Sequence, residues 1–166
     1  IRKEGFFEHS EDLKVDINTP YATEVKLRTS IAGAHLNNAQ AALNRGMYQD
    51  AINELAEVLN SKPSPSEEAQ VNYLLGKAYL KLGEIPRAIG YFEKAKTSEE
   101  QKYWAMLGIV NAYAIQKKTQ TGLPLLVEVM LKAEDENLKR EASNLFQKIS
   151  PFRSVLYVYS DPQGAK

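Results

Sequence analysis

The side chains that most often carry out chemistry are few in this sequence, and their spacing fits no catalytic or metal-binding motif. The two histidines, His9 and His35, fall in different segments, and neither has a second histidine four residues away, as a zinc site on one helix requires. The sequence has no cysteine, which excludes thiolate nucleophiles, disulfides and cysteine-ligated zinc. We therefore expect no catalytic residue, no metal site and no cofactor in this chain.

Carboxylates gather at two places, Glu99–Glu100 and Glu134–Glu136. Each cluster stands where a helix is predicted to begin, and negative charge is stabilised there by the helix dipole and by the free amide N–H groups of the first turn. The sequence contains no glycine-rich phosphate loop and no nucleophile elbow. We interpret both clusters as helix starts rather than acid–base pairs, and we predict that the chain is not an enzyme.

The composition is that of a globular protein with no bulk charge. The 166 residues suffice for one domain with a sizeable apolar core, and apolar residues make up 43% of them. The 21 basic and 21 acidic residues cancel, so the chain lacks the net positive charge with which proteins attract nucleic acid or anionic membranes. No apolar run approaches the ~20 residues that cross a bilayer, and we expect no transmembrane segment and no nucleic-acid partner.

Between residues 22 and 148 apolar side chains recur with the period of a helix and are interrupted at short intervals by glycine, proline or capping residues. Pro86 and Pro124 each follow such a break, and a first helical turn tolerates proline because its amide N–H groups are unpaired, so we expect both to begin helices. Short loops also imply that neighbouring helices run antiparallel. The predicted helices span about 22–45, 48–60, 67–82, 85–96, 99–117, 121–133 and 136–149.

The helix pairs repeat along the chain. Segments 46–52 and 83–89 match at three places with identical spacing, offset by 83 − 46 = 37 residues: Gly46 with Gly83, Ala51 with Ala88 and Ile52 with Ile89. A third unit keeps a period of 113 − 79 = 34 residues from Tyr79 to Tyr113, with Lys117 in place of the turn glycine. Self-similarity at such a period predicts a stack of helix pairs.

The second unit resembles the tetratricopeptide repeat, a helix-turn-helix unit of about 34 residues. The resemblance is carried by residues of the types and spacing that this family uses for packing: Leu75, Gly76, Tyr79, Gly83, Ala88, Tyr91, Phe92 and Ala95. Small side chains let the two helices of a pair approach closely, and large ones fill the gaps between pairs. The resemblance covers about 32–133 and implies an all-α solenoid of about three antiparallel pairs within a domain at 21–150, with the amphipathic segment 137–149 as a capping helix.

Two registers are possible for the third unit. The preferred register aligns Tyr113 with Tyr79. The alternative register lies two residues earlier and uses Trp104 and Leu107–Gly108, but it places Asn111 where the tyrosine belongs. We prefer the first register for that reason, and it predicts that the turn of the third unit lies at Lys117.

The two ends depart from the repeat. Residues 1–20 alternate apolar and polar side chains at Leu13, Val15 and Ile17, which predicts an extended arm. At the other end, segment 154–159 is β-branched and aromatic, which predicts a strand within residues 151–166. This strand could pair with the arm, because two unpaired apolar strands would favour aggregation.

The turn after the predicted strand, with Pro162, Gly164 and Ala165, resembles the opening of a PEGA domain, a small β module of bacterial and archaeal surface proteins. Gln163 stands where that family has glutamate, and a simple Pro–Gly turn is the alternative. The resemblance implies that the chain is a piece of a longer bacterial cell-envelope protein, which favours the periplasm or the envelope over the cytoplasm.

Tetratricopeptide stacks bind partner segments in a concave groove lined by the first helix of each unit. The resemblance places eight residues of this sequence there, with Trp104 near the rim: Leu36, Gln40, Asn44, Tyr73, Lys77, Lys81, Leu107 and Asn111. The two lysines, four residues apart on one helix face, could meet an acidic group, and the amides could bond an extended backbone. The alternative is a solvated face without a ligand.

The sequence thus predicts a non-enzymatic protein–protein interaction scaffold with a protein or peptide partner. One alternative is a structural spacer that positions a C-terminal β domain and has no groove ligand. Another is a domain that holds a small ligand or serves an enzyme, since a concave surface can enclose a small molecule. The three functions differ in what, if anything, occupies the groove.

Overall fold

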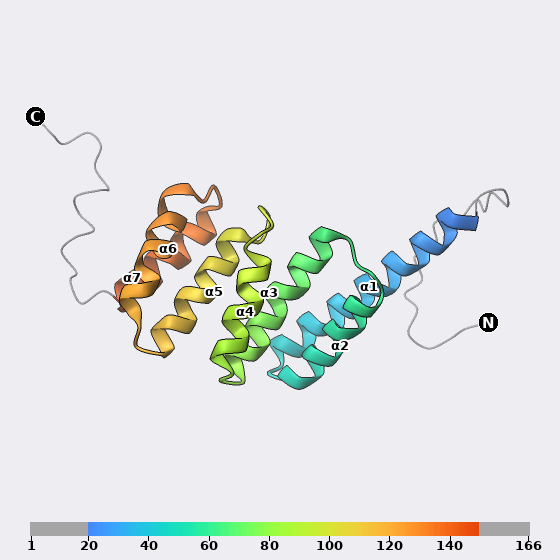
Figure 1. Cartoon of the computed structure of the whole chain (residues 1–166), viewed down its shortest axis with the longest axis horizontal. Helices are drawn as coiled ribbons and strands as arrows, with labels where there is room; N and C mark the ends of the chain where they lie inside the picture. Colours follow the sequence, from blue (N-terminus) through green and yellow to red (C-terminus); the bar gives the residue numbers. More distant parts are fainter. Residues whose placement is uncertain (1–19, 150–166) are drawn as a thin grey trace, which may run out of the picture.

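The computed structural model describes residues 20–149, and the side chains of residues 31–149. Over this range the chain is all-α, as predicted (Figure 1). The expected strand at 154–159, the PEGA-like turn and the expected arm, except Pro20, lie outside the described residues. The helices of the described range are α1 (Pro20–Asn44), α2 (Tyr48–Asn60), α3 (Pro65–Lys81), α4 (Ile85–Ala95), α5 (Lys102–Ile115), α6 (Thr119–Lys132) and α7 (Glu136–Ile149).

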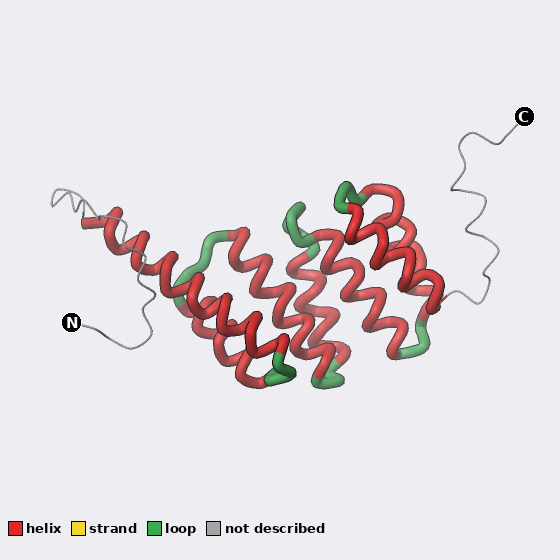
Figure 2. Tube along the Cα trace, turned by 180° about the vertical axis from the view of Figure 1, so that it is seen from behind, coloured by secondary structure: helices red, strands yellow, loops and turns green. Residues whose placement is uncertain are grey.

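Consecutive helices pack side by side in chain order along the long axis of the molecule (Figure 2). The most extensive contacts join α1 to α2, α3 to α4 and α5 to α6, which are the helix pairs that the repeat predicts. The odd-numbered helices also touch one another across the pairs, whereas α2, α4 and α6 do not contact each other in the described range. The structure is therefore a stack of antiparallel helix pairs in which α1, α3, α5 and α7 share one layer.

The turns within the three pairs are built alike. Gly46 and Gly83 have φ of 79° and 81°, and Lys117 has φ of 59°, so all three lie in the left-handed region. In each turn the next amide closes the helix end by bonding a carbonyl five residues back, at 2.8–2.9 Å: Met47 to Ala42, Glu84 to Tyr79 and Lys118 to Tyr113. The turn of the third unit is thus at Lys117, where the preferred register predicts it.

Lys117 is strained where the other two units have glycine. A residue with a Cβ loses about 1–2 kcal/mol in the left-handed region, and the extra entropy of glycine in the unfolded chain offsets part of that difference. We expect Lys117→Gly to raise the free energy of unfolding by about 0.5–1 kcal/mol in urea denaturation. As the matched control, Gly83→Ala, which meets no atom within 4 Å, should lower it by about 1 kcal/mol. A destabilising Lys117→Gly would contradict this account.

Phe92 of α4 fills the gap between two helix pairs, as predicted. Its side chain is fully buried between Gly76 of α3 and Gly108 of α5. A Cβ on Gly76 would lie 2.6 Å from the ring, and one on Gly108 would lie 2.5 Å from it. Position 108 therefore needs a glycine because the Phe92 ring of the preceding pair packs against its backbone. This contact accounts for the Leu107–Gly108 dipeptide on which the alternative register relies.

The last helix packs as the predicted cap does. Leu138 and Ala142 of α7 are buried against α5 and α6, and three further predicted residues, Leu145, Phe146 and Ile149, pack partly buried on the same cluster. Asp135 begins the helix by accepting a 2.7 Å hydrogen bond from the backbone N–H of Asn137. The carboxylates at 134–136 therefore serve a helix start, as the sequence indicates.

Three predictions about helix starts are wrong. Pro124 does not begin a helix: α6 starts at Thr119, so proline is the sixth residue and its missing N–H leaves the Gln120 carbonyl without the usual donor. Glu99 and Glu100 lie in the turn before α5 rather than in its first helical turn.

Helix α3 begins two residues earlier than predicted, because Ser64 and Glu67 form a capping box. Pro86, in contrast, lies in the first turn of α4, as predicted.

Candidate functional site

A groove of about 390 Å³ opens on the layer of odd-numbered helices. Helices α3 and α5 supply most of its lining, the buried Phe92 of α4 lies at its base, and α7 adds Glu141. We call it the α3–α5 groove. Its lining residues are Tyr73, Lys77, Leu80, Lys81, Phe92, Trp104, Leu107, Gly108, Asn111, Ile115 and Glu141.

Five of the eight predicted groove residues line the α3–α5 groove: Tyr73, Lys77, Lys81, Leu107 and Asn111. Trp104 lines it as well, although it lies on the first turn of α5. Helical spacing places the three residues of α3 on one face, and contact between α3 and α5 brings the second set opposite them.

The other three predicted residues, on α1, do not line this groove. Leu36 packs half-buried against the apolar cluster that joins α1, α2 and α3. Gln40 donates a 3.1 Å hydrogen bond from Nε2 to Oδ1 of Asn44, four residues away on the same helix. The groove therefore gathers the second and third units, and the side chains of the first unit lie apart from it.

Helix α7 adds residues that the sequence prediction missed. A smaller hollow of about 230 Å³ shares Leu107, Asn111 and Glu141 with the α3–α5 groove and continues along α7 to Asn144 and Lys148. The sequence signal was present, because positions 141, 144 and 148 recur at helical spacing on the polar face of a predicted helix. Only the packing of α7 against α5 shows that this face joins the groove.

The groove holds two lysines that form no ion pair with another described residue. Several basic residues elsewhere on the surface form local ion pairs, such as Arg87–Glu84 at 2.8 Å and Lys139–Glu136 at 2.8 Å. Among the described side chains, none forms an ion pair with Lys77 or Lys81. The Lys77 Nζ atom lies 5.4 Å from the centre of the Tyr73 ring, in cation–π contact.

Tyr73 is held in its neutral form at the base of the groove. Its ring packs against Phe92, with ring centres 6.0 Å apart. Burial, and secondarily the negative charge of Glu141, raise the pKa of Tyr73 from 10.0 to about 12. The phenol therefore remains a hydrogen-bond donor across the physiological pH range, flanked by a lysine and an aromatic ring.

The raised pKa of Tyr73 predicts a loss of stability in alkali. Because the folded pKa lies above the unfolded value, this contribution is constant below about pH 10 and is lost as the pH rises toward 12. The loss should be about 2 kcal/mol, below the full two-unit shift because the side chain is partly exposed. Tyr73→Phe should remove this component, measured as the difference between the two proteins' free energies of unfolding against pH. An unchanged pH dependence would contradict the assignment.

The described histidines and carboxylates are not gathered into a metal site. Across residues 31–149, no group of three or more His, Asp or Glu side chains is arranged to hold a metal ion. His35 joins α1 to α2 through a 2.7 Å contact between its Nδ1 and Oε2 of Glu54, and His9 lies outside the described residues. Among the described helices, none is long and apolar enough to span a bilayer.

The sequence matches no protein-family model and no curated protein.

Proposed function

We propose that this chain is a non-enzymatic protein-interaction scaffold of the tetratricopeptide type, which binds a segment of a protein partner in the α3–α5 groove. Two observations support the tetratricopeptide relationship. The three turns at Gly46, Gly83 and Lys117 recur with the spacing of the predicted repeats, and the hydrogen bonds that close them are alike. The bulky Phe92 fits between small residues of two successive pairs.

The observation that carries the binding proposal is the gathering of three kinds of side chain in one groove. Lys77 and Lys81 offer positive charge that the described residues leave unpaired. Asn111 is exposed and can bond a peptide backbone, while Ile115 is 59% exposed and offers an apolar contact. A peptide with an acidic residue close to an apolar one complements this arrangement.

Charge reversal in the groove tests the proposal. Peptides are selected from a random displayed library on the immobilised chain, and the selected sequences should be enriched in Asp or Glu next to an apolar residue. The double variant Lys77→Glu, Lys81→Glu should bind them at least about tenfold more weakly in calorimetry, because attraction is replaced by repulsion. Its free energy of unfolding should stay within about 1 kcal/mol, since Lys81 is exposed and Lys77 is half-buried.

The matched control makes the same charge change outside the groove. Lys117→Glu, Lys118→Glu alters two exposed lysines at the turn between α5 and α6 and should leave peptide binding unchanged. Equal weakening by both double variants would show that only net charge matters. Failure to select any peptide would favour the spacer alternative, and loss of binding only on deletion of residues 1–20 would move the binding surface to that arm.

A further inference from the structure

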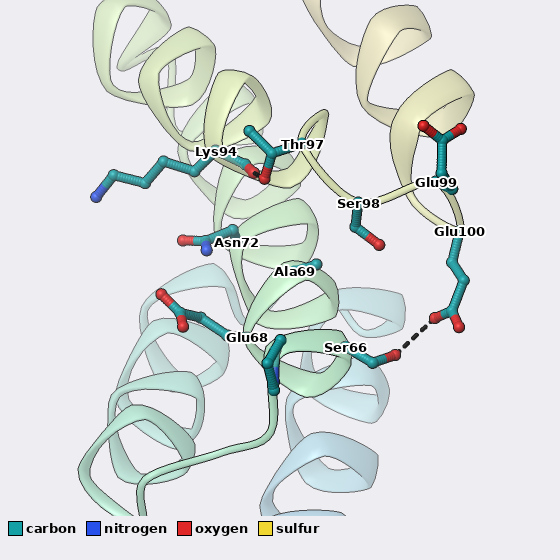
Figure 3. A pocket seen from close by; sticks show the side chains of 10 residues that line it. Ser66, Glu68, Ala69, Asn72, Lys94, Thr97, Ser98, Glu99 and Glu100 are labelled. Atoms are coloured by element: carbon teal, nitrogen blue, oxygen red, sulfur yellow. Dashed lines mark hydrogen bonds between the residues drawn. The ribbon is translucent and has the colours of Figure 1, made fainter.

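Another hollow, of about 670 Å³, lies between the first turns of α3 and the segment that joins α4 to α5 (Figure 3). It shares no lining residue with the α3–α5 groove, so its function goes beyond the one proposed above. We call it the Asn72 pocket. It is lined by Pro65, Ser66, Glu68, Ala69, Asn72, Lys94, Thr97, Ser98, Glu99 and Glu100.

Asn72 is the one buried polar side chain among residues 31–149, with 6% of its surface exposed. None of the hydrogen bonds between described residues involves its amide. Among the described side chains, every polar atom that is fully enclosed has a hydrogen-bond partner, so the unbonded Asn72 amide atoms are not fully enclosed. The amide atoms therefore reach the open space of the pocket. In Figure 3 they lie between the side chains of Lys94 and Glu68.

Packing does not require an amide at this position. One period of 34 residues later the chain has Met106, which is 4% exposed and belongs to the apolar core. A methionine-sized apolar side chain thus fills the corresponding place in the next pair. The Asn72 amide bonds no described residue and its atoms face the pocket, so a ligand there can complete its hydrogen bonds.

The charged side chains that line the pocket favour a positively charged ligand. Three carboxylates line the pocket, against one ammonium group, that of Lys94, whose Nζ lies 5.2 Å from the centre of the Tyr91 ring. Glu99 is 3.6 Å from Lys102, whereas Glu68 and Glu100 have no ion pair with a described residue. Glu100 instead accepts a 2.6 Å hydrogen bond from the Ser66 hydroxyl, which holds its carboxylate at the pocket (Figure 3).

We propose that the Asn72 pocket binds an organic cation through an ammonium or guanidinium group. The cation donates its N–H groups to Oδ1 of Asn72 and to the carboxylate of Glu68, which point to the same side of α3 in Figure 3. The Glu100 carboxylate, on the opposite side of α3, adds to the negative charge that lines the pocket. Pro65 and Ala69 provide apolar surface for its carbon chain. A bare metal ion fits less well, because no three acidic or imidazole side chains converge among the described residues. The group belongs either to a free polyamine or to a Lys or Arg side chain of a partner.

Calorimetric titration of the whole chain tests the pocket with two probes, spermidine and a capped triarginine peptide. At least one probe should bind with one-to-one stoichiometry. Asn72→Met, which copies the next pair, should weaken binding at least about tenfold while the thermal unfolding midpoint stays the same or rises. Glu100→Gln should weaken binding about three- to tenfold, and Lys94→Gln should strengthen it, because the pocket then loses its own cation.

Glu134→Gln is the matched control, since it removes one exposed carboxylate from the loop between α6 and α7. It should leave binding unchanged. Binding of spermidine alone identifies a free polyamine, binding of triarginine alone identifies a protein side chain, and binding of both supports recognition of the cationic group itself. The proposal is overturned if neither probe binds, if Asn72→Met binds as tightly as the parent, or if Glu134→Gln weakens binding as much as Glu100→Gln.

Discussion

Phe92→Ala is expected to lower the free energy of unfolding by about 3–5 kcal/mol. The ring is fully buried and lies between Gly76 and Gly108, so its removal leaves a cavity that neither glycine can fill. It also removes the aromatic contact with Tyr73 at 6.0 Å, which supports the base of the groove. Since domains are stable by about 5–15 kcal/mol, this loss is a large fraction of the total stability.

Chemical denaturation of Phe92→Ala and Phe92→Leu measures this effect. The leucine variant keeps much of the apolar volume and should lose markedly less stability than the alanine variant. A loss below about 1 kcal/mol for Phe92→Ala would contradict the position of the ring between the two helix pairs.

Gly108→Ala is the second substitution with a large expected effect. Its Cβ would lie 2.5 Å from the Phe92 ring, which is fully buried between Gly76 and Gly108. Overpacking of this kind lowers stability by about 1–3 kcal/mol. Alanine is also a better helix former than glycine, which stabilises the variant by about 1 kcal/mol. The measured loss of stability is therefore the cost of overpacking minus this gain.

Gly90→Ala is the control that isolates the overpacking. Gly90 lies within α4 and is exposed, and a Cβ at this position would meet no atom within 4 Å, so this substitution should raise stability by about 0.5–1 kcal/mol. The difference between the two alanine variants gives the cost of the contact with Phe92. Adding Phe92→Leu to Gly108→Ala should reduce that cost, and strictly additive effects would show that residues 92 and 108 do not touch.

The helices themselves could be predicted from the sequence because helix formation depends on local patterns. Apolar period, glycine turns and capping residues predicted seven helices, and the structure has seven helices in the described range. The errors are at helix starts. Pro124 was expected in a first turn, but α6 begins before it at Thr119, and the Ser64–Glu67 capping box moves the start of α3 to Pro65. Such ends depend on side-chain bonds and packing that an apolar pattern does not encode.

The candidate groove was predictable in part. Tyr73, Lys77 and Lys81 share one face of a single helix, so the spacing alone placed them together. Glu141 could not be assigned with them, because it lies 141 − 73 = 68 residues from Tyr73 and reaches the groove only through the packing of α7 on α5. Its charge then contributes to the raised pKa of Tyr73.

The all-α class, the helix pairs and their period could thus be inferred from the chain alone. Helices follow from interactions between residues a few positions apart, and the period follows from the recurrence of residue types along the chain. Which small residue accommodates which neighbour, and which polar side chain is buried, depends on how the pairs stack. Gly108 is small because of Phe92 in the preceding pair, and Asn72 is buried while His35, one period of 72 − 35 = 37 residues earlier, is bonded to Glu54. Equivalent positions in a repeat share a backbone, but their surroundings are set by different neighbours, and those contacts appear only when the pairs are stacked.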